Sequence, residues 1–189
     1  MTLKLHTIIC STRPGRVGPK VAEWFNGVAS AHGKFAPELV DLADFNLPAF
    51  DEPKHPAMQQ YEHEHTKRWA ASVASADAFA FVMPEYDFFP PATLVNAVQF
   101  VAREWHYKPA VIVSYGGISG GLRAAQAAKL LFTGVKMMPI PEGVPVPMVG
   151  QHVGEDGVFR PTDVIVGGAR LALDELHKWT VALKPARAA

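Results

Sequence analysis

The sequence has little cysteine. Only one of its 189 residues, Cys10, is a cysteine, and a single thiol can form neither an intrachain disulfide nor a cysteine-rich zinc site. This absence favours a reducing, cytoplasmic location. The first ten residues hold one lysine and a short apolar run that His6 interrupts, which is not the pattern of a secretory signal peptide.

The sequence also lacks an excess of charge of either sign. Eighteen Lys and Arg residues balance eighteen Asp and Glu residues. General nucleic-acid binding and docking on an anionic membrane both need a basic excess. In addition, no stretch approaches the roughly 18 consecutive apolar residues of a membrane span. We therefore expect neither nucleic acid nor a membrane as a partner.

What the sequence does contain is a regular alternation of two patterns. Short apolar runs predict buried strands, and longer segments with apolar residues three and four positions apart predict helices. The expected strands cover residues 3–10, 39–42, 78–83, 110–115 and 135–140, and the expected helices cover 19–32, 58–75, 93–105, 122–132 and a segment from 162. This order predicts a doubly wound α/β fold with a parallel sheet and helices on both of its faces.

The remaining segments complete a single expected domain, residues 1–183. Residues 44–56 carry three prolines and read as a loop. The turn signal Glu155-Asp156-Gly157 predicts a small hairpin. Thr162 is a suitable N-cap for the last helix, and residues 184–189 are expected to form a flexible tail.

Ligands of doubly wound folds bind outside the carboxyl ends of the strands, so the segments after the strands carry the functional prediction. The first of them (first loop, Ser11–Gly18) combines two hydroxyl side chains, two arginines and two glycines before a helix. A phosphate group needs such donors at a helix N-terminus. The loop matches neither the Walker pattern nor the dinucleotide fingerprint. The alternative is an ordinary polar turn between strand and helix.

Two further strand ends add a rigid aromatic wall and a glycine platform. The second loop, Pro84–Pro91, holds three aromatic residues and three prolines, which would suit a planar apolar ligand. Alternatively, Phe88 and Phe89 are core or interface residues. The third loop, Ser114–Gly121, holds four glycines, which permit close approach of a ligand or simply form a flexible turn. Together the loops favour a phosphorylated planar heterocycle.

These loops resemble those of the NADPH-dependent FMN reductase family. The run from Cys10 to Arg16 resembles the family's Gly-Ser-x-Arg phosphate loop, and Pro84-Glu85-Tyr86-Asp87 resembles its Pro-Glu-Tyr-Asn flavin loop. Ser114-Tyr115-Gly116-Gly117, followed by Gly120-Gly121-Leu122-Arg123-Ala124, resembles its third loop and helix. The resemblance spans about residues 3–132.

The resemblance implies a flavodoxin-like five-stranded sheet in the order 2-1-3-4-5 with non-covalently bound FMN. It also implies electrons taken as hydride from NADPH or NADH and passed to small acceptors, namely flavins, quinones, azo compounds or metal oxyanions. Members of the family are usually homodimers or homotetramers.

Carried over to this sequence, Ser11, Arg13 and the backbone of residues 16–18 would hold the FMN phosphate. Residues 84–87 would lie along the isoalloxazine ring, and residues 114–117 would pack beside it. The predicted cofactor-binding residues are thus Ser11, Arg13, Arg16, Val17, Gly18, Pro84, Glu85, Tyr86, Asp87, Ser114, Tyr115, Gly116 and Gly117. No catalytic acid or base is assigned, because the cofactor itself carries the chemistry.

This sequence departs from the family's pattern at three positions. Cys10 replaces a common glycine, Asp87 replaces a common asparagine, and Phe88 stands where small or polar residues are common. These departures concern redox tuning and substrate access more than FMN binding. The alternatives are a flavodoxin-like electron carrier, which is usually strongly acidic, and an FMN-binding module without turnover. A phosphatase is less favoured, because the first loop has no Cys-x5-Arg pattern.

A group of histidines, His55, His63 and His65, lies near two glutamates. On a helix, His63 and His65 would face different directions, and no His-Glu-x-x-His motif is present. A solvated helix face is therefore favoured over a metal site.

Overall fold

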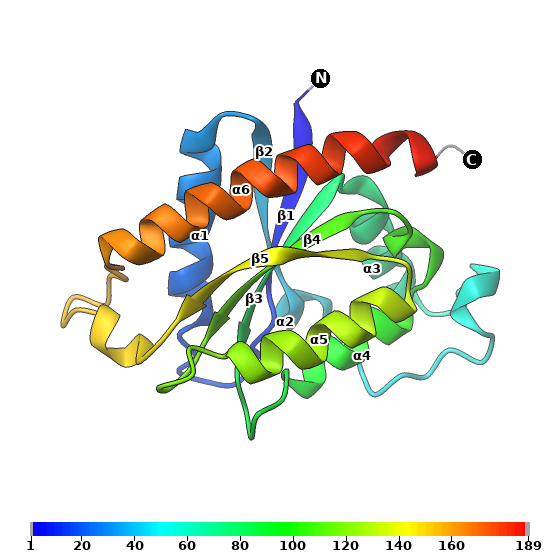
Figure 1. The fold of residues 1–189 in the computed structure, drawn as a ribbon. Helices are drawn as coiled ribbons and strands as arrows, with labels where there is room; N and C mark the ends of the chain where they lie inside the picture. The colour runs from blue at the N-terminus through cyan, green and yellow to red at the C-terminus, as the bar shows by residue number, and fades with distance from the viewer. Residues whose placement is uncertain (1, 188–189) are drawn as a thin grey trace.

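The computed structural model describes residues 2–187 and contains one five-stranded parallel sheet. Its strands lie in the order β2-β1-β3-β4-β5, as Figure 1 shows. They are β1 (Leu3–Ile9), β2 (Phe35–Asp41), β3 (Ala78–Pro84), β4 (Pro109–Tyr115) and β5 (Met138–Val146). The expected doubly wound fold and strand order are confirmed.

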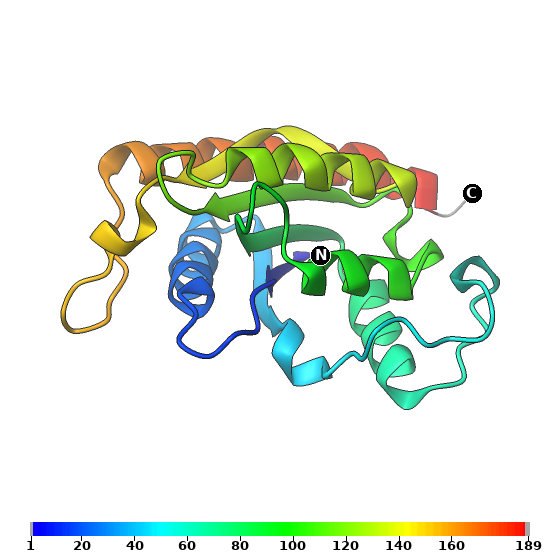
Figure 2. The ribbon, with the colours of Figure 1, turned by 90° about the horizontal axis from the view of Figure 1, so that it is seen from below.

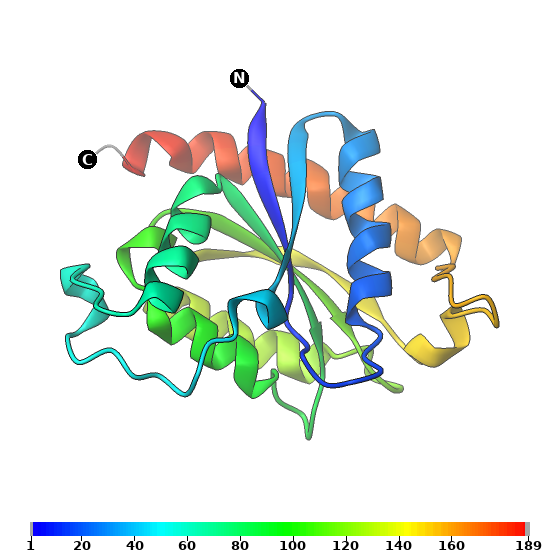
Figure 3. The ribbon, with the colours of Figure 1, turned by 180° about the vertical axis from the view of Figure 1, so that it is seen from behind.

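Helices cover both faces of the sheet (Figures 2 and 3). One face carries α1 (Gly18–His32) and α6 (Asp163–Leu183), whose apolar side chains form one buried cluster with the sheet. The other face carries α2 (Leu42–Phe45), α3 (Glu64–Ser75), α4 (Ala92–Phe100) and α5 (Leu122–Gly134), which share a second cluster. Short 3-10 helices lie at η1 (Pro56–Met58), η2 (Arg103–Trp105), η3 (Val149–His152) and η4 (Lys184–Arg187).

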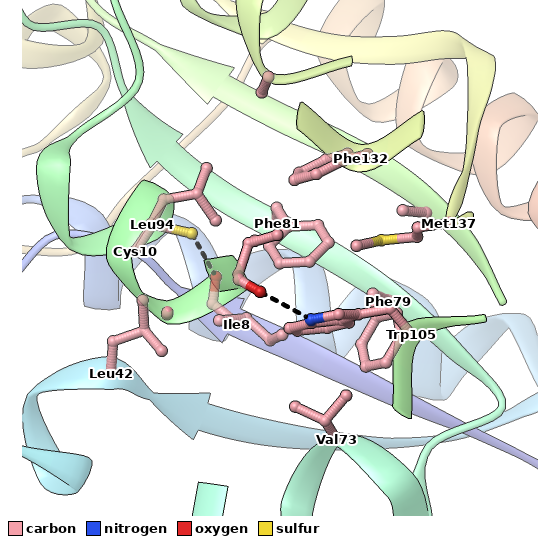
Figure 4. Close-up of a cluster of buried hydrophobic side chains, with 14 of the residues drawn as sticks. Ile8, Cys10, Leu42, Val73, Phe79, Phe81, Leu94, Trp105, Phe132 and Met137 are labelled. Carbon is pink, nitrogen blue, oxygen red and sulfur yellow. Dashed lines mark hydrogen bonds between the residues drawn. The ribbon is translucent and has the colours of Figure 1, made fainter. Parts of the chain in front are cut away.

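The second cluster is rich in large aromatic side chains (Figure 4). Trp105 lies among Phe79, Phe81 and Met137, and its indole N–H donates to the Val98 carbonyl at 3.1 Å. Because each such side chain contributes roughly 1.5–3 kcal/mol when it is fully buried, this face anchors the central strands. Those strands in turn fix where their carboxyl ends lie.

Both edge strands differ from the predicted ranges. β2 begins at Phe35 instead of residue 39, and β5 covers Met138–Val146 instead of 135–140. Edge strands are half exposed and tolerate proline, and the two strands contain Pro37, Pro139, Pro141 and Pro145. The apolar-run signal of a buried strand is therefore interrupted in both.

Two predicted helices are also shorter. In the segment 58–75, only Met58 belongs to η1, and α3 begins at Glu64. Just before α3, the Glu52 carboxylate accepts hydrogen bonds from the backbone N–H groups of Glu62 and His63 at 2.8 and 3.1 Å. The segment 93–105 is divided into α4 and η2. The divided segment still keeps its apolar side chains buried.

The C-terminal third follows the sequence pattern in part. Thr162 is the N-cap of α6, as predicted, and its Oγ1 accepts from the Ile165 N–H. The expected hairpin is reduced to one bridge between Val153 and Phe159. Within the expected tail, η4 is ordered by an ion pair of 3.0 Å between Arg187 and Asp77, and residues 188–189 lie outside the described residues.

Among residues 2–187, no helix combines the length and the apolar character that crossing a membrane requires.

Candidate functional site

The three loops meet at the carboxyl edge of the sheet, the lower edge in Figure 1 and the edge facing the viewer in Figure 2. They enclose a cavity of about 170 Å³. Its lining consists of Arg13, Arg16, Val17, Pro84, Glu85, Tyr86, Tyr115, Gly116 and Val149. The fold thus brings together predicted site residues from all three loops.

The first loop leads into an uncapped helix N-terminus. Val17 is the N-cap residue of α1, and its side chain accepts no hydrogen bond from the first turn. The first N–H groups of a helix have no partner within the helix, and they attract anions. Ser11 lies beside this turn, buried, with its Oγ 3.1 Å from the Tyr115 hydroxyl. The arrangement can hold a phosphate.

The two arginines of the first loop have different environments. Arg16 donates to both carboxylate oxygens of Asp41, at the end of β2, and to the Ser11 carbonyl. The hydrogen bond that Arg16 donates to Asp41 raises the pKa of Arg16 above its usual value. Arg13 is exposed and lies 5.9 Å from the centre of the Tyr86 ring. Only Arg13 therefore has a side chain available for a ligand.

The second loop ends in a tight two-residue turn. Tyr86 and Phe89 exchange both backbone hydrogen bonds, at 3.0 and 2.8 Å, and the residues between them, Asp87 and Phe88, have φ angles of +49° and +68°. Positive φ at both central residues is the mark of a type I′ turn. Phe88 and Phe89 remain 64% and 63% exposed, so neither is a core residue. Asp87 lies at the tip, outside the cavity lining.

Glu85 faces the third loop and α5. Its carboxylate accepts from the Ser119 hydroxyl at 2.8 Å and from the backbone N–H groups of Arg123 and Ala124 at 3.0 and 3.2 Å. Burial alone would raise the pKa of Glu85, but these hydrogen bonds, with that of the Arg123 guanidinium, lower it below its usual value. Glu85 therefore supplies the cap that Gly121, the N-cap residue of α5, cannot supply.

The third loop is held by close backbone packing. Ser114 turns its hydroxyl to the Gly120 carbonyl at 2.9 Å. Gly121 has φ +81°, and a Cβ there would lie 2.8 Å from the Tyr115 nitrogen. The carbonyls of Gly116 and Gly117 accept from Val149 and Met148, respectively. The glycines thus serve tight packing, and of residues 114–117 only Tyr115 and Gly116 line the cavity.

Several residues near this edge belong to no motif of the sequence. Val149 lines the cavity from η3, a segment with no motif of its own. A second hollow of about 260 Å³ lies between Thr12, α2 and α4, and an apolar groove of about 650 Å³ continues from it past Phe89. Asn96 lines both, and its side-chain amide bonds the Pro48 carbonyl and the Phe50 N–H. Only tertiary structure brings these residues together.

The histidines are arranged differently from the prediction. His63 is the N-cap residue of α3 and lies outside its helical turns, so its ring stacks on His65 with 5.2 Å between ring centres. The two rings therefore face each other, and the prediction that they point in different directions was wrong. Asp51 lies 3.0 Å from His65. Within the described part of the chain, no group of three or more His, Cys, Asp or Glu residues could hold a metal ion.

Comparison with known proteins gives concordant matches. Residues 3–151 match the family model described as NADPH-dependent FMN reductase. An NAD(P)H-dependent FMN reductase of Schizosaccharomyces pombe is 42% identical over 128 residues, which cover 67% of this chain and 64% of that protein, slightly less than two thirds of it. An NAD(P)H-dependent FMN reductase from Nectria sp is 38% identical over 170 residues, which cover 87% of this chain and 83% of that protein.

A solved structure is also similar. The flavoenzyme FerB of Paracoccus denitrificans, an NAD(P)H:acceptor oxidoreductase, superposes with a TM-score of 0.75 at 18% identity, covering 96% of this chain and 99% of that one. At this identity the likeness supports the flavodoxin-like fold alone.

Proposed function

The chain belongs to the NADPH-dependent FMN reductase family, and from this premise we propose that it is an oxidoreductase of the NAD(P)H-dependent FMN reductase type that holds FMN as a resident cofactor at the three loops. The phosphate would lie at the first loop, with the flavin ring against the second and third loops.

The observation that carries this proposal is the uncapped N-terminus of α1 beside a three-loop cavity. The backbone N–H groups of residues 16–18, the Ser11 hydroxyl and the Arg13 guanidinium are the donors that a phosphate monoester requires. A Cβ at position 18 would overlap Ser11 Oγ, so glycine lets the first turn of α1 lie directly against that hydroxyl. The residues present therefore fit the phosphate end of FMN.

The size of the cavity limits what it can enclose. Sites that bury a drug-sized ligand measure roughly 300–1,000 Å³, whereas this one measures about 170 Å³. It suffices for the phosphate and part of the ribityl chain. The ring would then rest on the outer surface of Pro84–Asp87, open to nicotinamide and to an acceptor in turn.

When bound, FMN would supply the hydride chemistry: it would accept a hydride, which is two electrons and one proton, from NADPH or NADH and pass both electrons and that proton to the acceptor, any further proton coming from water. The protein's part is to bind the cofactor and to orient it. Tyr86 offers an aromatic face beside Arg13, and Glu85 holds the second loop against α5. The acceptors are small molecules, and we propose flavins, quinones and azo compounds.

An electron-carrier function is less well supported. Carriers of this fold dock on basic partners through an acidic surface, whereas this chain has a net charge of zero. A carrier would also stay oxidised with NADPH alone, so rapid bleaching of the flavin by NADPH would distinguish the two functions.

We further propose that the chain forms a homodimer or homotetramer. Apolar side chains remain exposed on the second and third loops, with Phe88, Phe89 and Ile118 at 64%, 63% and 87%. Such a concentration around a site is typical of a surface that another molecule covers.

The experiment is an absorbance spectrum of the purified, desalted protein before and after addition of NADPH under nitrogen. We expect a stoichiometric flavin band that bleaches. Arg13→Met should weaken FMN binding by roughly 10- to 100-fold, the value of one charge-assisted hydrogen bond. Arg170→Met, an exposed arginine on α6, is the matched control. A colourless protein that does not bind added FMN would refute the proposal.

A further inference from the structure

Tyr115, the last residue of β4, reaches the first loop. In the sheet, β3 lies between β1 and β4, yet the Tyr115 hydroxyl donates across the end of β3 to Ser11 Oγ at 3.1 Å. Tyr115 is 5% exposed and Ser11 is 1% exposed. The contact therefore joins the third loop to the first inside the protein.

This contact determines what the Ser11 hydroxyl can still do. A serine hydroxyl has one proton to donate and two lone pairs to accept with. Within residues 2–187, Tyr115 is the partner of Ser11 Oγ, and it uses a lone pair. A tyrosine hydroxyl is protonated at neutral pH, and in this contact it is the donor. The proton of Ser11 remains free for an acceptor.

The first turn of α1 fixes where that acceptor lies. A Cβ at Gly18 would lie 2.3 Å from Ser11 Oγ and 2.9 Å from the Tyr115 hydroxyl, so both hydroxyls lie directly against the start of the helix. The N-terminal N–H groups there have no side-chain cap. An anion bound to them is within reach of the Ser11 proton.

We propose that Tyr115 is a positioning residue for the phosphate of the flavin: it holds the Ser11 hydroxyl so that Ser11 donates to the phosphate monoester. This inference rests on the proposed function, and it assigns Tyr115 to the phosphate end of the site instead of the flavin ring. It predicts that Tyr115 affects the preference for FMN over riboflavin, which has the same ring and no phosphate.

The test compares dissociation constants of FMN and riboflavin, measured by fluorescence titration of the flavin-free protein. Tyr115→Phe should weaken FMN binding about five- to tenfold, as expected for one oriented hydrogen bond, and leave riboflavin binding unchanged. Ser11→Ala should do the same. In the double variant, adding Tyr115→Phe to Ser11→Ala should cause no further loss of FMN affinity, because the effect of Tyr115 passes through Ser11. Tyr107→Phe, an exposed tyrosine at the other end of β4, is the control.

Other outcomes overturn the inference. If Tyr115→Phe weakens both flavins equally, Tyr115 contacts the ring, and if its effect adds to that of Ser11→Ala, it acts independently. If Tyr115→Phe fails to fold, Ser11→Ala tests the other end of the same contact, and an unchanged ratio of FMN to riboflavin affinity in that variant would contradict the inference. Wild-type protein that binds neither flavin refutes the proposed function as well, whereas tight FMN binding with an unchanged ratio refutes only this inference.

Discussion

At the residue scale, His6 is a buried polar group with few partners. It lies on β1, 1% exposed, with Ser75 Oγ at 3.4 Å from Nε2 and Glu38 at 3.8 Å, and its Nδ1 has no hydrogen-bond partner. Burial lowers the pKa of His6 to about 4; Glu38 opposes this shift, and Lys4 and Lys108 add to it. His6 is therefore neutral at pH 7.

This pKa predicts an acid-dependent loss of stability. Above pH 6.5 the folded and unfolded states both hold neutral His6. As the pH falls from 6.5 to about 4, the unfolded state binds the proton more strongly, and the free energy of unfolding falls by roughly 3 kcal/mol at most. Urea unfolding between pH 7 and pH 4 should show this fall in the free energy of unfolding for the wild type. The fall due to His6 should be absent in His6→Gln. Equal pH dependence of the two proteins would contradict the assignment.

The sequence marks individual site residues better than it places their side chains. Ser11, Arg13 and Tyr86 are recognisable from loop position and residue type, and the fold brings all three to one edge. Glu85 and Tyr115 stand in equally recognisable motifs, but the Glu85 side chain caps α5 and the Tyr115 side chain reaches the first loop. The direction in which each of these two side chains points depends on contacts between segments about 35 or 100 residues apart. No local sequence pattern encodes such contacts.

At the element scale, the N-terminus of α5 depends on a residue of the second loop. Gly121 has no side chain to cap the helix, and Glu85 accepts from the N–H groups of Arg123 and Ala124 in its place. Loss of a cap costs roughly 0.5–2 kcal/mol, and the bonds from Ser119 and the Arg123 guanidinium are lost with it. We expect Glu85→Ala to lower the free energy of unfolding by about 2–4 kcal/mol.

Two measurements check this expectation. Urea unfolding should give the loss of stability, and hydrogen exchange should show faster exchange at the Arg123 and Ala124 amides. Glu62→Ala is the control, because that carboxylate is half exposed and, within residues 2–187, pairs with Lys54 alone, at 3.5 Å. If the free energy of unfolding falls equally little in both variants, the cap contributes nothing to stability.

The elements that the sequence places correctly are those with strong local signals. β1, β3 and β4 are buried on both faces and read as continuous apolar runs, and their observed bounds differ from the predicted ones by a single residue. The edge strands β2 and β5 are proline-containing and half exposed, and their bounds shift further. Burial on both faces is thus what makes a strand readable from sequence.

At the scale of the whole molecule, the alternation of strands and helices predicts the doubly wound fold, since parallel neighbours require a helical crossover. The strand order itself came from the family resemblance of three loops, and the structure confirms it. Assembly between copies is different, because it depends on surface side chains that no periodicity identifies.

The net charge of zero bears on that assembly, because copies of the chain do not repel one another at long range. The apolar residues exposed near the cavity lie on two loops that Glu85 and Ser119 join at 2.8 Å. A charge at Ile118, 87% exposed on the third loop, should therefore oppose association. We expect the wild type to sediment as a dimer or tetramer and Ile118→Glu to shift toward monomer. Leu130→Glu, at a similarly exposed leucine of α5, should change nothing. A monomeric wild type, or equal effects of the two variants, would exclude this surface as the interface.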